Sequence, residues 1–330
     1  MLPGHFQPDP AMTCLYPDLE PYASHVLEHE GQQLYVEESG TPHGVPVLFL
    51  HGGPGSSCKP YHRSLFDPGR YRIILADQRG AGRSQPQGDL SANNTPALLR
   101  DMEFIRQSLG VERWLLFGGS WGATLALLYA QAHRDRVTGL ILRGVFLARA
   151  EDLAWFVGES GVRRIYPEAW EQLQATLSAW EQDDPLPALY RHLTGSDELA
   201  QRRAARAWDR WGAQVALGEA CDPRAVDEHV PWAAVNQASI ELHYAVNRYF
   251  IRENAILDAV DRLAGLPCAI VHGRRDLVCP VEAAWRLHLA LPDSTLTILP
   301  EAGHIAAGEA MLGALIDATD AMASHLEAAR

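Results

Sequence analysis

The residues GGSWG at 118–122 fit the pattern GxSxG, in which a serine can act as a nucleophile. The apolar run WLLF at 114–117 precedes this motif, and the apolar stretch ATLALLY at 123–129 follows it. This context predicts a sharp strand-to-helix turn that exposes the Ser120 hydroxyl beside a helix N-terminus, which favours developing negative charge. We interpret the motif as a nucleophile elbow; a glycine-rich turn with an incidental serine is the alternative.

A serine hydroxyl needs a base and an orienting acid, which follow such an elbow in the order Ser, Asp or Glu, His. Asp276 and His304 each follow a short apolar run, so we expect both in loops at the C-terminal ends of strands. We assign His304 as the base and Asp276 as its orienting acid. His272 is a rival base, but its place at a strand end predicts burial. Glu301 is a rival acid, but it is too near His304 in sequence to reach around it.

A glycine-rich loop, HGGPG at 51–55, directly follows another apolar run. Such a loop lets a backbone N–H approach the oxyanion of a tetrahedral intermediate, paired with the N–H of the residue after the nucleophile. We predict Gly53 and Trp121 as these donors, with Gly52 as the alternative in the loop. His51 is expected to pin the loop and to take no part in catalysis.

Strand-like runs alternate with amphipathic stretches such as residues 96–109, which predicts an α/β fold with a mostly parallel, doubly wound sheet. Between residues 145 and 254 the strand-like runs vanish, and six of the nine tryptophans occur there. We therefore predict an all-helical cap at 145–254, inserted into a core formed by 1–144 and 255–330. The predicted strands are Gln33–Glu38, Pro46–Leu50, Arg72–Ala76, Trp114–Phe117, Gly139–Leu142, Cys268–Val271 and Thr295–Leu299.

The composition argues against several classes of partner. Lysine and arginine total 28 against 41 acidic residues, a net charge of −13, which disfavours nucleic acid and anionic lipid. Five cysteines without a CxxC pair suggest neither a disulfide framework nor a metal site, and a cytoplasmic location fits best. The uncharged stretch 114–132 is broken by the glycine motif, so no membrane span is predicted. The oligomeric state is left open.

The motifs together resemble those of the proline iminopeptidase family of α/β-hydrolase serine peptidases. The resemblance implies an α/β-hydrolase fold with an inserted helical cap. It also implies release of an N-terminal proline from a small peptide with a free N-terminus, without metal or organic cofactor, through Ser120, Asp276 and His304. The matching segments are HGGPG at 51–55, DQRGAGRS at 77–84, GGSWGATLAL at 118–127, LRGVF at 142–146, GRRD at 273–276 and GH at 303–304.

In that family, carboxylates of the cap bind the ammonium group of the substrate, and the resemblance implies this role for Glu241. It also implies substrate contacts for the W-x-x-W pair, Trp208 and Trp211. A second family glutamate falls after this pair, where this chain has Gly212. The carboxylates left to replace it are Asp209 and Glu219.

Two other hypotheses keep the scaffold and change the function. Because one carboxylate is absent, the chain could be a cofactor-free esterase or amidase of small apolar acyl groups. A non-catalytic ligand-binding homologue is the third possibility. The segment 145–254 holds 17 acidic and 11 basic residues, and this charge would attract a cationic peptide N-terminus. Arg79 and Arg83 have no phosphate-binding fingerprint beside them, so we expect them to pair with carboxylates.

Overall fold

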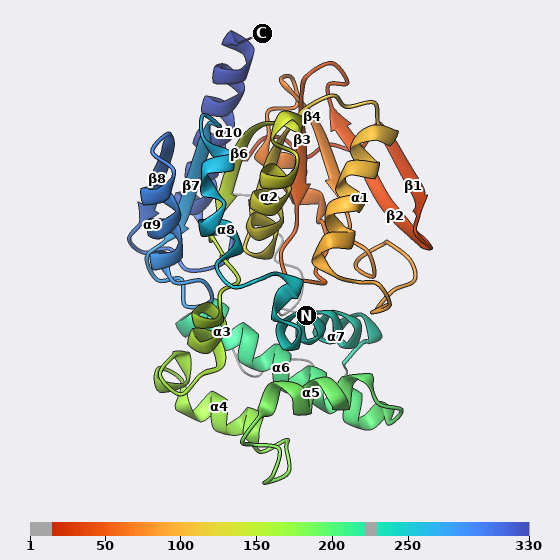
Figure 1. Cartoon of the computed structure of the whole chain (residues 1–330), viewed down its shortest axis with the longest axis vertical. Helices are drawn as coiled ribbons and strands as arrows, with labels where there is room; N and C mark the ends of the chain where they lie inside the picture. Colours follow the sequence, from red (N-terminus) through yellow and green to blue (C-terminus); the bar gives the residue numbers. More distant parts are fainter. Residues whose placement is uncertain (1–14, 222–229, 330) are drawn as a thin grey trace.

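The computed structural model describes residues 15–221 and 230–329. Its centre is an eight-stranded sheet in the order β1-β2-β4-β3-β5-β6-β7-β8 (Figure 1). β2 runs antiparallel to β1 and β4, and all other neighbours are parallel. The strands are β1 (Ala23–His29), β2 (Gln32–Gly40), β3 (Val45–Leu50), β4 (Tyr71–Ala76), β5 (Trp114–Gly119), β6 (Val137–Arg143), β7 (Cys268–Gly273) and β8 (Ser294–Leu299).

Alternation of side chains along the central strands builds a core on each face of the sheet. In β3, Leu48 and Leu50 point to one face, where they join the cluster formed with helices α1, α2 and α9. Val47 and Phe49 point to the other face, where the 3₁₀ helix η1 and helix α10 cover them. These elements are η1 (Pro60–Leu65), α1 (Thr95–Ser108), α2 (Trp121–Ala132), α9 (Val281–Ala290) and α10 (Glu309–Ala328).

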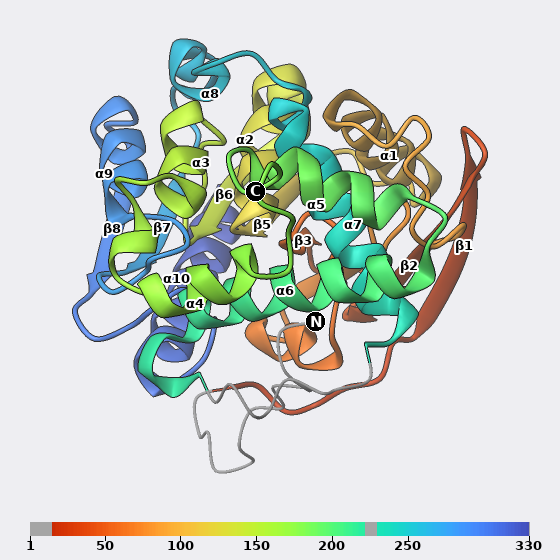
Figure 2. The same ribbon diagram turned by 90° about the horizontal axis from the view of Figure 1, so that it is seen from below.

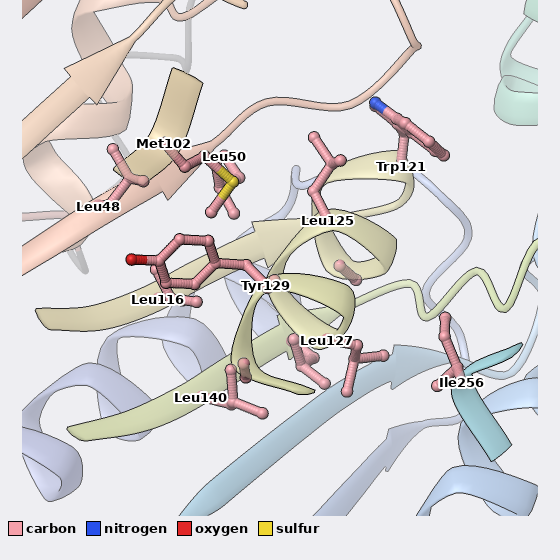
Figure 3. Close-up of a cluster of buried hydrophobic side chains, with 14 of the residues drawn as sticks. Leu48, Leu50, Met102, Leu116, Trp121, Leu125, Leu127, Tyr129, Leu140 and Ile256 are labelled. Atoms are coloured by element: carbon pink, nitrogen blue, oxygen red, sulfur yellow. The ribbon is translucent and has the colours of Figure 1, made fainter. Parts of the chain in front are cut away.

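Helix α2 lies at the centre of the first of these cores. Figure 3 shows Leu125, Leu127 and Tyr129 of this helix among side chains of β3, β5 and β6. Nearly every residue of α2 is buried, so the helix has no polar face and is packed on all sides. The start of α2, and Ser120 immediately before it, are therefore held firmly against the sheet.

The described elements between β6 and β7 are all helical. They include α3 (Ala150–Val157), α4 (Pro167–Gln174), α5 (Pro185–Thr194), α6 (Glu198–Leu217), α7 (Trp232–Val246), η5 (Arg248–Phe250) and α8 (Ala255–Asp258). Helices α4 to α7 form a layer across one end of the sheet (Figures 1 and 2), with a separate apolar core around Leu189, Trp208 and Trp211. We propose that this layer is the cap, with the boundaries 145 and 254 expected from the sequence.

The predicted fold class is confirmed, with differences at its edges. Each of the seven predicted strands matches a strand of the sheet, and the predicted helix 96–109 is observed as Thr95–Ser108. The uncharged stretch 114–132 forms β5, a turn and α2. Strand β1 was not predicted. Among the described residues, no helix has the length and apolar character needed to span a membrane.

Two glycines test how tightly α2 is held. A Cβ at Gly122 would overlap the backbone carbonyl of Leu50, whereas a Cβ at Gly313 in α10 meets nothing within 4 Å. Gly122→Ala should lower the free energy of unfolding by about 3 kcal/mol or more, because backbone must move. Gly313→Ala should raise it by about 0.5–1 kcal/mol, because alanine favours the helix. Urea unfolding of both variants measures this; equal effects would contradict the packing described for α2.

Candidate active site

Ser120 lies in the sharp turn between β5 and α2 and has the unusual backbone angles φ 57° and ψ −122°. Its N–H donates to the Arg143 carbonyl at 2.9 Å, and its own carbonyl accepts from the Ala123 N–H at 2.9 Å. A Cβ at Gly118 would overlap the Gly122 carbonyl oxygen, so the turn requires glycine at that position. The predicted elbow is therefore present, and it places the Ser120 side chain at the end of β5.

The loops after β7 and β8 bring Asp276 and His304 together. His304 Nδ1 lies 2.8 Å from Asp276 Oδ2, and Asp276 Oδ1 accepts from the N–H groups of Val278 and Cys279 at 3.0 and 2.8 Å. Burial alone would raise the pKa of Asp276, but His304, the nearby His272 ring and the Cys279 N–H together hold that pKa below its ordinary value. Asp276 is thus an ionised, buried carboxylate that fixes the His304 ring through Nδ1.

Several contacts place Ser120 beside this pair. Ser120 Oγ is 4.0 Å from Cys279 Sγ, in the loop that holds Asp276. Arg143, whose carbonyl binds the Ser120 N–H, also donates through its guanidinium to the His304 carbonyl. Within the described residues Ser120 and His304 share no hydrogen bond, so a proton transfer needs the ring and hydroxyl to approach, as such pairs commonly do when substrate binds.

The two rival residues differ in their relation to this pair. His272 is fully buried: its Nδ1 accepts from the Val145 N–H at 3.2 Å and its Nε2 donates to the Cys279 carbonyl at 2.7 Å. Burial lowers the pKa of His272, so the ring is neutral and both of its nitrogens are occupied. Glu301 is exposed and pairs with Arg275. His272 Nε2 also lies 3.5 Å from Asp276 Oδ2, so the ring flanks this carboxylate with its nitrogens engaged within the protein. His304 and Asp276 remain our predicted base and acid.

The HGGPG loop lies directly beside the elbow. A Cβ at Gly52 would be 3.5 Å from Ser120 Cβ, so the loop backbone passes close to the nucleophile. Gly53 has φ +114°, a conformation that favours glycine. His51 is 2% exposed and bonded to its surroundings, as expected for a residue that pins the loop. Gly53 and Trp121 remain our predicted oxyanion donors, with Gly52 the alternative.

Glu241 of α7 is held in place by neighbouring side chains of the cap. Its Oε2 accepts from Trp208 Nε1 at 2.7 Å, and its Oε1 accepts from Gln237 Nε2 at 2.9 Å. Burial raises the pKa of Glu241, and the charge of Asp209 raises it further. The preceding residue, Ile240, lies close enough to Gly55 that a Cβ there would be 2.9 Å from Ile240 Cβ. The backbone of α7 therefore passes close to the HGGPG loop at Ile240, the residue before Glu241.

Of the two candidate replacement carboxylates, only Asp209 is near enough for its charge to act on Glu241. Burial raises the pKa of Asp209, which follows Trp208 on α6. Glu219 is exposed in the turn after α6, where its charge acts on Tyr166. A Cβ at Gly212 would meet nothing within 4 Å, so a glutamate could be accommodated there.

The second tryptophan of the W-x-x-W pair has different surroundings from the first. Trp211 is 1% exposed and stacks edge-on with Trp170 at 5.0 Å, and it also contacts Phe156. These contacts belong to the core of the helical layer. Trp208 bonds directly to Glu241, so the two tryptophans differ in their relation to the site. Substrate contact for either remains a prediction.

The arginines of the DQRG segment pair with carboxylates, as expected. Arg79 makes two hydrogen bonds of 2.6 Å with Asp101, and Arg83 bonds to Asp77 and Glu37, each at 2.8 Å. These pairs fix the loop after β4. In the part of the chain that the structure describes, no group of three His, Cys, Asp or Glu side chains is arranged to hold a metal ion.

Three residues near the site were not singled out from the sequence. Gln78 bonds to both His51 and Trp121. Tyr249, with φ 54°, packs on Trp121 with ring centroids 5.7 Å apart. Cys279 contacts Ser120. Only Gln78 carried a signal, because it lies in a motif directly after a strand; the others are brought in by tertiary packing.

Comparison with known proteins agrees with this geometry. Residues 45–310 match the alpha/beta hydrolase fold family. A probable proline iminopeptidase from Leptolyngbya boryana is 44% identical, covering 94% of this chain and 97% of that protein. A proline iminopeptidase from Xylella fastidiosa is 45% identical, covering 94% and 99%. The solved proline iminopeptidase of Mycobacterium smegmatis shares the fold, with a TM-score of 0.57, 18% identity, and coverage of 92% and 100%.

The fold and the match over residues 45–310 make this protein an α/β hydrolase. At 44–45% identity over nearly the full length of both relatives, the chain belongs to the proline iminopeptidase family. The resemblance stated from the sequence motifs is thereby confirmed.

Asp276→Asn tests the orientation of His304. The amide cannot hold the imidazole in the tautomer that leaves Nε2 available as a base, so kcat should fall by roughly 10⁴-fold with the fold intact. Glu301→Gln, a matched loss of one carboxylate in the next loop, should leave kcat unchanged. Steady-state kinetics of both variants on an ester or arylamide measures the difference. Comparable losses in both variants would contradict the assignment of Asp276.

Proposed function

We propose that this protein is a serine exopeptidase that releases an N-terminal proline from small peptides. The observation that carries the proposal is the grouping of Ser120 at the elbow, the bonded pair Asp276–His304, and a cap carboxylate, Glu241, next to the residue of α7 that lies against the HGGPG loop. The names of the family relatives support the same activity. An esterase of apolar acyl groups would need no carboxylate near the acyl site, so the geometry favours the aminopeptidase.

The chemistry follows from the three residues of the proposed triad. His304 Nε2 takes the Ser120 proton as Oγ attacks the prolyl carbonyl carbon, and the Asp276 carboxylate stabilises the imidazolium that forms. Backbone N–H groups of Trp121 and the 52–53 loop stabilise the oxyanion, each worth on the order of 10²–10³ in rate. His304 then protonates the leaving amine, and water attacks the acyl-enzyme by the same route, releasing proline.

We infer that the cap carboxylates bind the free N-terminus of the substrate. Trp208 and Gln237 each donate a hydrogen bond to Glu241 and so orient its carboxylate. Glu241 and Asp209 are two partly buried carboxylates near one another, and both have raised pKa values. A bound prolinium cation would offset the cost of burying their charges and reduce the repulsion between them. We infer that this pair receives the substrate ammonium, with Asp209 replacing the family carboxylate absent at Gly212.

A panel of substrates on the purified protein tests the activity. Prolyl 4-nitroanilide should be hydrolysed with kcat/KM at least 10-fold above other aminoacyl nitroanilides and cyclopentanecarbonyl 4-nitroanilide, which lacks the ring nitrogen. Ser120→Ala should abolish hydrolysis while its circular dichroism stays unchanged. Full activity of Ser120→Ala, or a preference for the cyclopentane compound or for short-chain nitrophenyl esters, would overturn the proposal.

Variants of the two carboxylates test the ammonium site. Glu241→Gln and Asp209→Asn should each lower kcat/KM for prolyl 4-nitroanilide by about 10–100-fold, as expected when a hydrogen bond to a charged group is lost. The cyclopentanecarbonyl analogue should change by less than about 3-fold. Equal losses on the two substrates would show that these residues only support the fold.

The open space at Gly212 allows a rescue experiment. If Asp209 replaces a carboxylate that relatives carry after the second tryptophan, Gly212→Glu should restore most of the prolyl activity lost in Asp209→Asn. Failure of this rescue, with both variants folded, would remove Asp209 from the site and leave Glu241 as the anchor.

A further inference from the structure

Gln78, two residues after β4, lies between the two segments that supply the proposed oxyanion donors. Its Nε2 donates to the His51 carbonyl at 2.9 Å, and its backbone N–H donates to His51 Nε2 at 3.0 Å. On the other side, its Oε1 accepts from the indole Nε1 of Trp121 at 3.1 Å. One side chain therefore joins the start of the HGGPG loop to the first residue of α2.

The hydrogen bonds allow only one orientation of this amide. The indole N–H of Trp121 can only donate, so it must face Oε1, and the His51 carbonyl can only accept, so it must face Nε2. Because His51 Nε2 accepts from the Gln78 N–H, the neutral imidazole carries its proton on Nδ1, which donates to the Gly52 carbonyl at 2.9 Å. Gln78 is thus linked to Gly52 by hydrogen bonds through the His51 ring.

Gln78 is itself anchored through its neighbour. Asp77 is 1% exposed; its Oδ1 accepts from the Cys58 N–H at 2.8 Å, and its Oδ2 accepts from Arg83 Nε at 2.8 Å. The chain just after the glycine-rich loop is therefore fixed to the same segment. Trp121 is equally immobile, since its ring is fully buried and contacts Tyr244 at a centroid distance of 5.1 Å.

We propose that Gln78 is a positioning residue that sets the separation between the two backbone donors of the oxyanion hole. Such donors act only when both lie about 2.7–3.1 Å from the oxyanion, and they come here from segments some 70 residues apart in the chain. The proposal rests on the hydrolase function proposed above. The hydrogen bonds of the Gln78 side chain go to His51 and Trp121, so it acts through these two residues.

The test compares Gln78→Glu and Gln78→Met with wild type. Glutamate keeps an acceptor for the Trp121 indole but places an oxygen against the His51 carbonyl, and methionine removes both bonds at similar length. Each variant should lower kcat for prolyl 4-nitroanilide by about 10–100-fold while KM changes less than about 3-fold, because only the transition state uses the hole. Gln87→Glu, which removes one exposed bond to the Gly82 carbonyl in the same segment, should change neither value.

A second readout separates positioning from general loss of structure. A prolyl boronic acid forms a tetrahedral adduct on Ser120 whose oxygen occupies the oxyanion hole, whereas free proline binds without using it. The inhibition constant of the boronic acid should rise in parallel with the fall in kcat, and that of proline should stay within about 3-fold of wild type.

Other outcomes overturn the proposal. Equal weakening of boronic acid and proline, or no change in either, would show that Gln78 does not position the hole. If neither variant folded, Gln78 would be needed for stability and the positioning role would be rejected. A wild-type protein that neither cleaves prolyl nitroanilide nor reacts at Ser120 would instead refute the proposed function, so the two failures are distinguishable.

Discussion

The site depends on a close backbone contact where α2 leaves the sheet. Gly122, in the first turn of α2, lies so near the carbonyl of Leu50 that no side chain fits between the helix and β3. This contact brings the end of β5, which carries Ser120, against the loop that follows β3. The positive φ of Ser120 is a strained conformation for a serine, and a helix that is buried on all sides holds it there. Close backbone packing therefore brings Ser120 against the HGGPG loop, and the hydrogen bonds of Gln78 also join that loop to α2.

Charges and hydrogen bonds position the two carboxylates of the proposed site, Asp276 and Glu241. Asp276 is buried and stays ionised because His304 and two backbone N–H groups face it, which also settles the tautomer of His304. In the helical layer, Glu241 is oriented by neutral donors and has no cation bonded to it among the described residues. Asp276 is therefore bonded to a histidine within the protein, whereas we propose that Glu241 receives a cationic substrate.

Much of this could be predicted from sequence, for reasons visible in particular residues. The central strands are continuous apolar runs because both of their faces are buried, and Asp276 and His304 stand out because each follows such a run. Strand β1 was missed because it is an edge strand without a fully buried residue, where Val26 is 63% exposed and the sequence ASHVLEH contains no continuous apolar run. Our preference for Asp209 over Glu219 depends on the packing of α6, and the role that we propose for Gln78 depends on both of its partners.

The central claim is that Ser120 attacks a prolyl carbonyl whose oxygen enters a hole formed by two separate segments. The most direct measurement is a crystal structure of the protein after reaction with the diphenyl phosphonate analogue of proline. We expect phosphorus bonded to Ser120 Oγ, its phosphoryl oxygen about 2.7–3.1 Å from the N–H of Trp121 and from one N–H of residues 52–53, and the ring nitrogen beside Glu241. Phosphorus on another residue, or an oxygen directed away from both segments, would contradict the account.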